Sequence, residues 1–191
     1  TLEQYHEDLI CCSACLAGSL PQAILEENME KAEEIALWYK NLFGEDYYLE
    51  IQTNTLKEQT LVNQKLVGLS RKLNIPLVAT NDAHYTRKED AYNHEVLLCI
   101  QTGKKMSDTD RMRFATNDFY IKSPEEVKEF FPNLPEALEN TVKIAQKCNV
   151  EFEFGHTILP NYEVPKEFAT HYDYFKKLCD EGIRKRYGQE P

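Results

Sequence analysis

The stretch Ile75-Pro-Leu-Val-Ala-Thr-Asn-Asp-Ala-His-Tyr85 is the segment from which the fold of this chain is predicted. Its first six residues form a short aliphatic run, which is typical of a buried β-strand. Asp82 and His84 follow directly, where that strand is expected to end. In an extended segment, residues i and i+2 point to the same side. The pattern therefore predicts that a carboxylate and an imidazole converge on one ion or one substrate.

The same strand-then-helix plan occurs three times in the first hundred residues. Strands are expected at residues 9–12, 47–51 and 75–80, and helices at 21–43, 55–73 and 88–101. Thr55-Leu-Lys-Glu58 has the pattern of a capping box, and Gly44 and Gly103 stand where helices commonly end. Because the connections are short, the strands should be parallel with right-handed crossovers. The sequence therefore predicts an α/β fold.

Three chemically reactive loops should meet at one edge of this sheet, since parallel strands have their carboxyl ends on the same side. The first contains Cys15, the second follows Glu50 and Gln52, and the third contains Asp82 and His84. Thiolate, carboxylate and imidazole groups all bind zinc and related divalent metals. Each also has an ordinary interpretation, as a buried thiol or as a polar loop residue. Glu50 and Gln52 either orient metal ligands or simply line the strand end.

Beyond residue 103 the plan changes. A polar, irregular stretch (104–121) precedes a short helix opened by Ser123-Pro-Glu-Glu126, and a longer helix is expected at 135–147. Residues 151–165 read as extended and interrupted by prolines, and 170–187 as an amphipathic helix ending at Gly188. We expect a domain boundary near residue 150. Three strand–helix units cannot close a barrel of about eight strands, so the sheet is either small and open or lacks its first half.

The composition is that of an ordinary soluble chain. Of its 191 residues, 42% are hydrophobic and 28% charged, and no run approaches the length of a membrane span. Three of the six cysteines crowd one short segment and the others lie in expected helices or helix ends, which is not a disulfide framework and indicates a reducing, cytoplasmic setting. The net charge of −10 argues against a nucleic-acid-binding surface over the whole chain. The chain begins at Thr1 rather than Met, as expected of a processed product or an excised piece.

Other catalytic patterns are absent from the sequence. It contains no P-loop, no GxGxxG and no serine nucleophile elbow. Arg111 and Arg113 are interpreted either as a phosphate contact or as part of a solvated loop. The remaining histidines are interpreted as ordinary helix or loop residues: His6, His94, His156 and His171.

Several longer motifs resemble the alpha subunits of bacterial DNA polymerase III, the C-family replicative polymerases. They are Ser13-Ala-Cys-Leu-Ala-Gly18, Ala36-Leu-Trp-Tyr-Lys40, Tyr48-Leu-Glu-Ile-Gln52, Leu77-Val-Ala-Thr-Asn-Asp-Ala-His-Tyr85, His94-Glu-Val-Leu-Leu-Cys-Ile-Gln-Thr-Gly103, Arg111-Met-Arg-Phe114 and Pro135-Glu-Ala-Leu-Glu-Asn-Thr141. The resemblance extends over essentially the whole chain.

This resemblance implies that residues 1–150 are the C-terminal part of a polymerase-and-histidinol-phosphatase (PHP) domain, a distorted β/α barrel, and that 151–191 begin the polymerase palm. It also implies that Cys15, Asp82 and His84 ligate zinc or manganese. The family's amino-terminal His-x-His motif and its catalytic aspartates are missing from this chain. The metal site is therefore expected to be incomplete, and no catalytic or cofactor-binding residue of the polymerase is assigned.

The implied parent protein is a DNA-directed DNA polymerase for chromosomal replication. It would use DNA, deoxynucleotides and magnesium, and it would associate with a sliding clamp and an exonuclease subunit but not with a membrane. A complete PHP site would support 3′–5′ proofreading by metal-assisted phosphoester hydrolysis. Two alternatives remain: a free-standing PHP phosphoesterase acting on a small ester such as histidinol phosphate, or a structural scaffold that docks a separate exonuclease. The chain alone is expected to be inactive and to self-associate through open strand edges.

Overall fold

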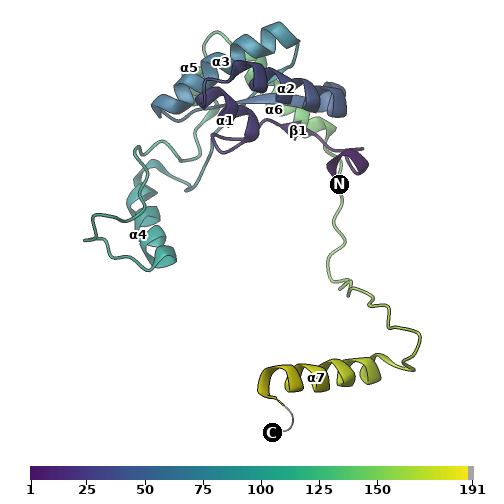
Figure 1. Cartoon of the computed structure of the whole chain (residues 1–191). Coiled ribbons are helices and arrows are strands. Elements are labelled where there is room, and N and C mark those ends of the chain that lie inside the picture. Colours follow the sequence, from purple (N-terminus) through teal and green to yellow (C-terminus); the bar gives the residue numbers. More distant parts are fainter. Residues whose placement is uncertain (189–191) are drawn as a thin grey trace. The chain divides into compact units, whose positions relative to one another are not determined.

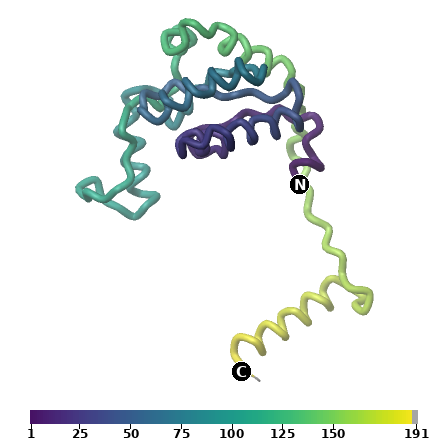
Figure 2. Tube along the Cα trace, turned by 45° about the horizontal axis from the view of Figure 1, so that its top comes forward, coloured from purple at the N-terminus to yellow at the C-terminus, as the bar shows by residue number. Residues whose placement is uncertain are grey.

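Three strands, β1 (Cys11–Cys12), β2 (Tyr47–Gln52) and β3 (Leu77–Thr80), form one sheet in the order β1-β2-β3. Both neighbouring pairs are parallel. The chain passes from β1 to β2 through α1 (Ser19–Leu25) and α2 (Met29–Phe43), and from β2 to β3 through α3 (Lys57–Leu73). Figure 1 shows these helices gathered at the sheet, and the trace in Figure 2 follows both crossovers from purple to blue. The predicted α/β fold with parallel strands is confirmed.

The computed structural model describes residues 1–188. The chain divides into two compact units that meet between Asn149 and Val150. After β3, the first unit contains α4 (Ala91–Thr102), α5 (Pro124–Phe130) and α6 (Pro135–Lys147). Short 3₁₀ turns lie at Leu2–Gln4, Gly44–Asp46 and Lys88–Asp90. The assignment of the two units to a PHP domain and a palm stays a prediction.

One face of the sheet supplies the core. Alternate residues of β2, Tyr47, Leu49 and Ile51, are at most 1% exposed. They pack with Leu77 and Ala79 of β3 and with apolar side chains of α1, α2, α3, α5 and α6. Removing this much apolar surface from water is the main stabilising contribution to the unit. The intervening residues of β2 and β3 belong to the opposite face, and that face becomes polar towards the strand ends.

The prediction of a single helix at 21–43 is wrong, because the chain forms two helices there. Glu27 has φ +57°, a left-handed conformation that interrupts a right-handed helix. Asn28 then caps the second helix, since its Oδ1 accepts a hydrogen bond from the Lys31 amide at 3.0 Å. The break separates α1 from α2, and the two helices pack against each other.

The capping box expected at Thr55 is also wrong. The first helical residue of α3 is Lys57, its N-cap is Leu56, and no side chain caps it. The Thr55 hydroxyl instead donates a hydrogen bond to the Asp118 carboxylate, 63 residues away. The Thr55 hydroxyl therefore makes a tertiary contact and does not cap the N-terminus of α3, as the local pattern had predicted.

The start of α5 and the end of α4 lie where the sequence predicted them. Ser123 and Glu126 form the predicted capping box of α5. Gly103 ends α4 with φ +65°, a conformation that glycine adopts without strain.

The second unit contains α7 (His171–Tyr187), which is capped by the Thr170 hydroxyl and ends at Gly188. Residues 151–165 form no helix or strand. The rings of Tyr162 and Tyr174 stack at 5.9 Å, and the His171 imidazole contacts the Tyr162 carbonyl at 2.9 Å. Across residues 1–188, no helix combines the length and the hydrophobicity required to span a bilayer.

The core predicts a clear difference between two leucines of α3. Leu66 is fully buried and Leu61 is 41% exposed. We expect Leu66→Ala to lower the free energy of unfolding by about 2–5 kcal/mol, because it leaves a cavity. Leu61→Ala should change it by less than about 0.5 kcal/mol. Urea denaturation followed by circular dichroism measures both, and equal losses would contradict this description of the core.

Candidate functional site

The loop after β1 is bound tightly to β2. The Ser13 amide donates a hydrogen bond to the Tyr48 carbonyl at 3.0 Å, and the Ser13 hydroxyl accepts one from the Glu50 amide at 2.8 Å. Cys15, two residues further on, is partly buried. Its carbonyl accepts a hydrogen bond from the Gly18 amide at 2.8 Å. A Cβ atom at Gly18 would lie 2.7 Å from the Ser13 carbonyl oxygen, so this tight loop requires glycine.

A polar cluster lies beside this loop, on the face of the sheet opposite the core. The Glu50 carboxylate accepts hydrogen bonds from the Thr80 hydroxyl at 2.6 Å and from the Gln52 side-chain amide at 3.4 Å. The side-chain oxygen of Gln52 is buried without a hydrogen-bond partner. Burial and then the Glu50 charge raise the pKa of Cys12 to about 11, so this thiol stays protonated at neutral pH.

Asp82 and His84 lie close together, but not for the predicted reason. β3 ends at Thr80, and Asp82 has φ +51°, so the segment turns and does not continue as an extended strand. The expected convergence by strand alternation is therefore wrong. In the turn, the His84 Nδ1 atom lies 2.9 Å from the Asp82 carbonyl oxygen and 3.9 Å from its carboxylate. A proton on Nδ1 shared with that carbonyl leaves the lone pair of Nε2 available to a ligand.

A distant segment holds this turn in place. The backbone amides of His84 and Tyr85 both donate hydrogen bonds to the Phe119 carbonyl, at 2.8 and 3.2 Å. The side-chain oxygen of Asn81 accepts a hydrogen bond from the Lys122 amide at 3.1 Å. Lys122 is buried, and burial lowers the pKa of its amine. The 81–86 turn is thus fixed from both ends by the chain itself.

His94 has a more specific environment than the sequence indicated. Its ring lies 5.9 Å from that of His84, 5.3 Å from that of Tyr85 and 5.0 Å from that of Phe114. Burial, and then the nearby His84, lower the pKa of His94. No local spacing connects a helix residue with rings ten positions earlier and twenty later, so the sequence contained no signal for this cluster.

The interpretation of Arg111 as part of a solvated loop is wrong. Its side chain is 8% exposed and lies 2.5 Å from the Glu95 carboxylate of α4. Its Nε also donates a hydrogen bond to the Met106 carbonyl at 3.1 Å. Arg111 therefore ties the irregular 104–121 segment to α4.

The structure brings Asp82 and His84 together but does not group Cys15 with them. Among residues 1–188, no three His, Cys, Asp or Glu side chains are close enough to hold a metal ion. β1 and β3 lie on opposite sides of β2, so backbones at their ends are separated by about 10 Å. The ligand role of Cys15, Asp82 and His84 stays a prediction.

The chain resembles known proteins over almost its whole length. The model of the PHP domain matches residues 1–54. A DNA polymerase III subunit alpha from Borreliella burgdorferi is 49% identical over 97% of this chain, and relatives of the same name from Campylobacter jejuni and Thermus aquaticus are 41% and 38% identical over the same share. The chain spans 16%, 18% and 16% of the length of these three relatives.

The environment of His94 predicts a pH effect. The pKa of His94 is lowered from its usual value of 6.5, so the unfolded chain binds this proton more readily than the folded chain. Stability should therefore fall as the pH drops below about 6.5 and through the folded pKa. An NMR titration of the histidine ring protons should give His94 a midpoint below 6.5. His84→Gln removes a neighbouring positive charge and should move that midpoint upward. A midpoint at or above 6.5 in the unaltered chain would contradict this prediction.

Proposed function

Since this chain is homologous over 97% of its length to a segment of DNA polymerase III alpha subunits, we propose that it is part of a DNA-directed DNA polymerase for chromosomal replication. The observation that carries this proposal is the 49% identity to the Borreliella burgdorferi protein. In such a protein, DNA and deoxynucleotides would be the substrates and magnesium would serve the polymerase reaction. A sliding clamp and an exonuclease subunit would be its partners.

We further propose that the loops at the carboxyl edge of the sheet contribute Cys15, Asp82 and His84 to a divalent metal site of zinc or manganese. Two observations support this. The contact of His84 Nδ1 with a carbonyl leaves Nε2 free, the arrangement common to metal-binding histidines. Thiolate, carboxylate and imidazole together suit zinc and similar ions.

The separation of Cys15 from the Asp82–His84 turn is compatible with one shared ion or with a pair of neighbouring ions. Catalytic metal pairs are spaced by about 3.5–4 Å, and each ligand bond adds about 2 Å. A cluster of this kind bridges side chains from strands about 10 Å apart. The remaining ligands would come from residues outside this chain. Bound metals would activate a water molecule and neutralise a phosphate, as 3′–5′ proofreading requires.

The chain's own residues would orient this site. Glu50 lies on the central strand and binds Thr80 of β3, while its amide holds Ser13 of the Cys15 loop. These bonds fix the first loop against the sheet beside the strand that leads to the Asp82–His84 turn. Fixed ligands lose little conformational entropy when a metal binds.

The chain alone should lack both activities. We expect it to retain fewer than two equivalents of zinc or manganese after dialysis, because the ligands it supplies do not complete a cluster. It should also fail to extend a DNA primer with magnesium and deoxynucleotides. Elemental analysis and a primer-extension assay measure the two outcomes. Tight binding of two or more ions per chain would overturn the proposal of an incomplete site.

Replacing His84 in a full-length polymerase separates catalysis from scaffolding. If the site hydrolyses phosphoesters, His84→Ala should lower exonuclease activity by at least about tenfold. Primer extension should change little. His156→Ala is the matched control, because this histidine lies in the second unit with a side chain that is 66% exposed. Unchanged exonuclease activity together with a lower melting temperature would contradict the catalytic role and indicate a structural metal.

A further inference from the structure

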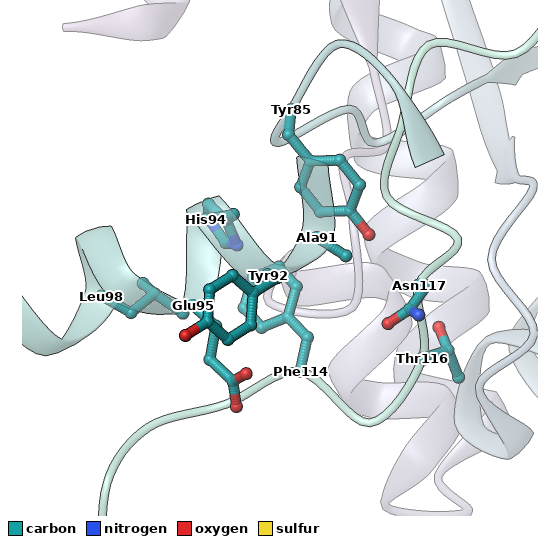
Figure 3. A pocket seen from close by; sticks show the side chains of 9 residues that line it. All are labelled: Tyr85, Ala91, Tyr92, His94, Glu95, Leu98, Phe114, Thr116 and Asn117. Carbon is teal, nitrogen blue, oxygen red and sulfur yellow. The ribbon is translucent and has the colours of Figure 1, made fainter. Parts of the chain in front are cut away.

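A pocket of about 290 Å³ lies between α4 and the loops on either side of it. Figure 3 shows the rings of Tyr85, Tyr92 and Phe114 around this space, together with the polar ends of Glu95, Thr116 and Asn117. The volume is at the lower end of the range for small-molecule sites, which suits one flat ring system rather than an extended ligand. No member of the proposed metal site lines this pocket.

The aromatic side chains offer a surface for stacking. The rings of His94 and Phe114 lie 5.0 Å apart, and those of His94 and Tyr85 lie 5.3 Å apart. These three rings pack against one another and form one side of the pocket. Tyr92 lies on α4 and is 64% exposed. Its ring is therefore accessible to a planar ligand. Aromatic rings of this kind bind nucleobases by stacking whatever the base, because every base has a π-face.

The polar groups supply hydrogen bonds at the edge of the pocket. The Thr116 hydroxyl is buried and has no hydrogen-bond partner within the described part of the chain, an arrangement that normally costs stability. Arg111 lies 2.5 Å from the Glu95 carboxylate and holds it in a fixed orientation. A carboxylate accepts a hydrogen bond from an amino group, and a hydroxyl or an amide bonds to a ring nitrogen.

The local charge does not repel a phosphate. The whole chain has 22 Lys and Arg against 32 Asp and Glu, whereas residues 87–122 contain seven basic and six acidic side chains. The segment around the pocket therefore has a net charge of +1, whereas the whole chain has a net charge of −10.

We propose that this pocket binds an unpaired nucleobase that carries an exocyclic amino group, such as adenine. The base stacks on Tyr92, its amino group donates to Glu95, and Thr116 and Asn117 bond to its ring edge. The base comes either from single-stranded DNA or from a free nucleotide. The inference stands on the pocket alone and requires neither the metal site nor polymerase activity.

The test uses the chain with a fluorescein-labelled oligomer of ten deoxyadenylates, with binding followed by fluorescence anisotropy. Tyr92→Ala should weaken binding about tenfold through lost stacking. Thr116→Val, which keeps the shape of the side chain but removes its hydroxyl, should weaken binding about fivefold. Tyr172→Ala is the matched control, since this tyrosine of α7 is 70% exposed and lies in the other unit. Circular dichroism verifies that each variant keeps its helical content.

Two further probes identify the source of the base. If deoxyadenosine monophosphate binds and loses affinity in Tyr92→Ala, the pocket takes a free nucleotide. If only the oligomer binds with this dependence, it takes a base of a DNA strand. Either result supports the proposal. It is overturned if an abasic oligomer of equal length binds as tightly as the deoxyadenylate oligomer, if neither ligand binds at millimolar concentration, or if Tyr92→Ala and Tyr172→Ala give the same affinity.

Discussion

The parallel register of the three strands is the constraint on which the rest of the first unit depends. Gln52 pairs with Thr80, so β2 and β3 end side by side, while β1 pairs only with the start of β2, where Cys12 faces Tyr48. Ser13 extends this pairing beyond the end of β1 through the Glu50 amide. The three loops that carry polar chemistry are thereby fixed to one edge. Any candidate site on this edge is a consequence of register rather than of loop sequence alone.

The same register gives the two faces of β2 different roles. Tyr47, Leu49 and Ile51 fill the core, and the alternate residues Glu50 and Gln52 build the polar cluster. Because side chains alternate with a period of two, a slip of one residue would move the Glu50 carboxylate into the apolar core and the aliphatic side chains into the polar cluster. The cost of burying an unpaired charge makes such a slip strongly unfavourable. Core packing and site geometry are therefore specified by one set of contacts.

The sequence predicted those features that depend on local periodicity and on strong end signals. The three strands, the parallel connections, the Ser123 capping box and the Gly103 helix end all follow from patterns within a few residues. The errors arose where a group had two competing partners or the backbone turned. Thr55 bonds to Asp118 rather than to its own helix, and Glu27 takes a left-handed conformation inside an otherwise helical pattern. The proximity of Asp82 and His84 was predicted, but a turn and not a strand produces it. The environment of His94 required contacts across the chain that no spacing encodes.

Protein contacts hold the Asp82–His84 turn in place. Phe119 accepts two backbone hydrogen bonds from it, and Asn81 accepts one from Lys122. A loop ordered only by its ligand must lose conformational entropy when the ligand binds, at about 1–2 kcal/mol for each residue fixed. In this chain, the turn loses that conformational entropy when the protein folds, before a ligand binds. The long connection through α4 to residue 119 is therefore part of the site's architecture, because it returns the chain to the turn and fixes the position of His84 before any ligand arrives.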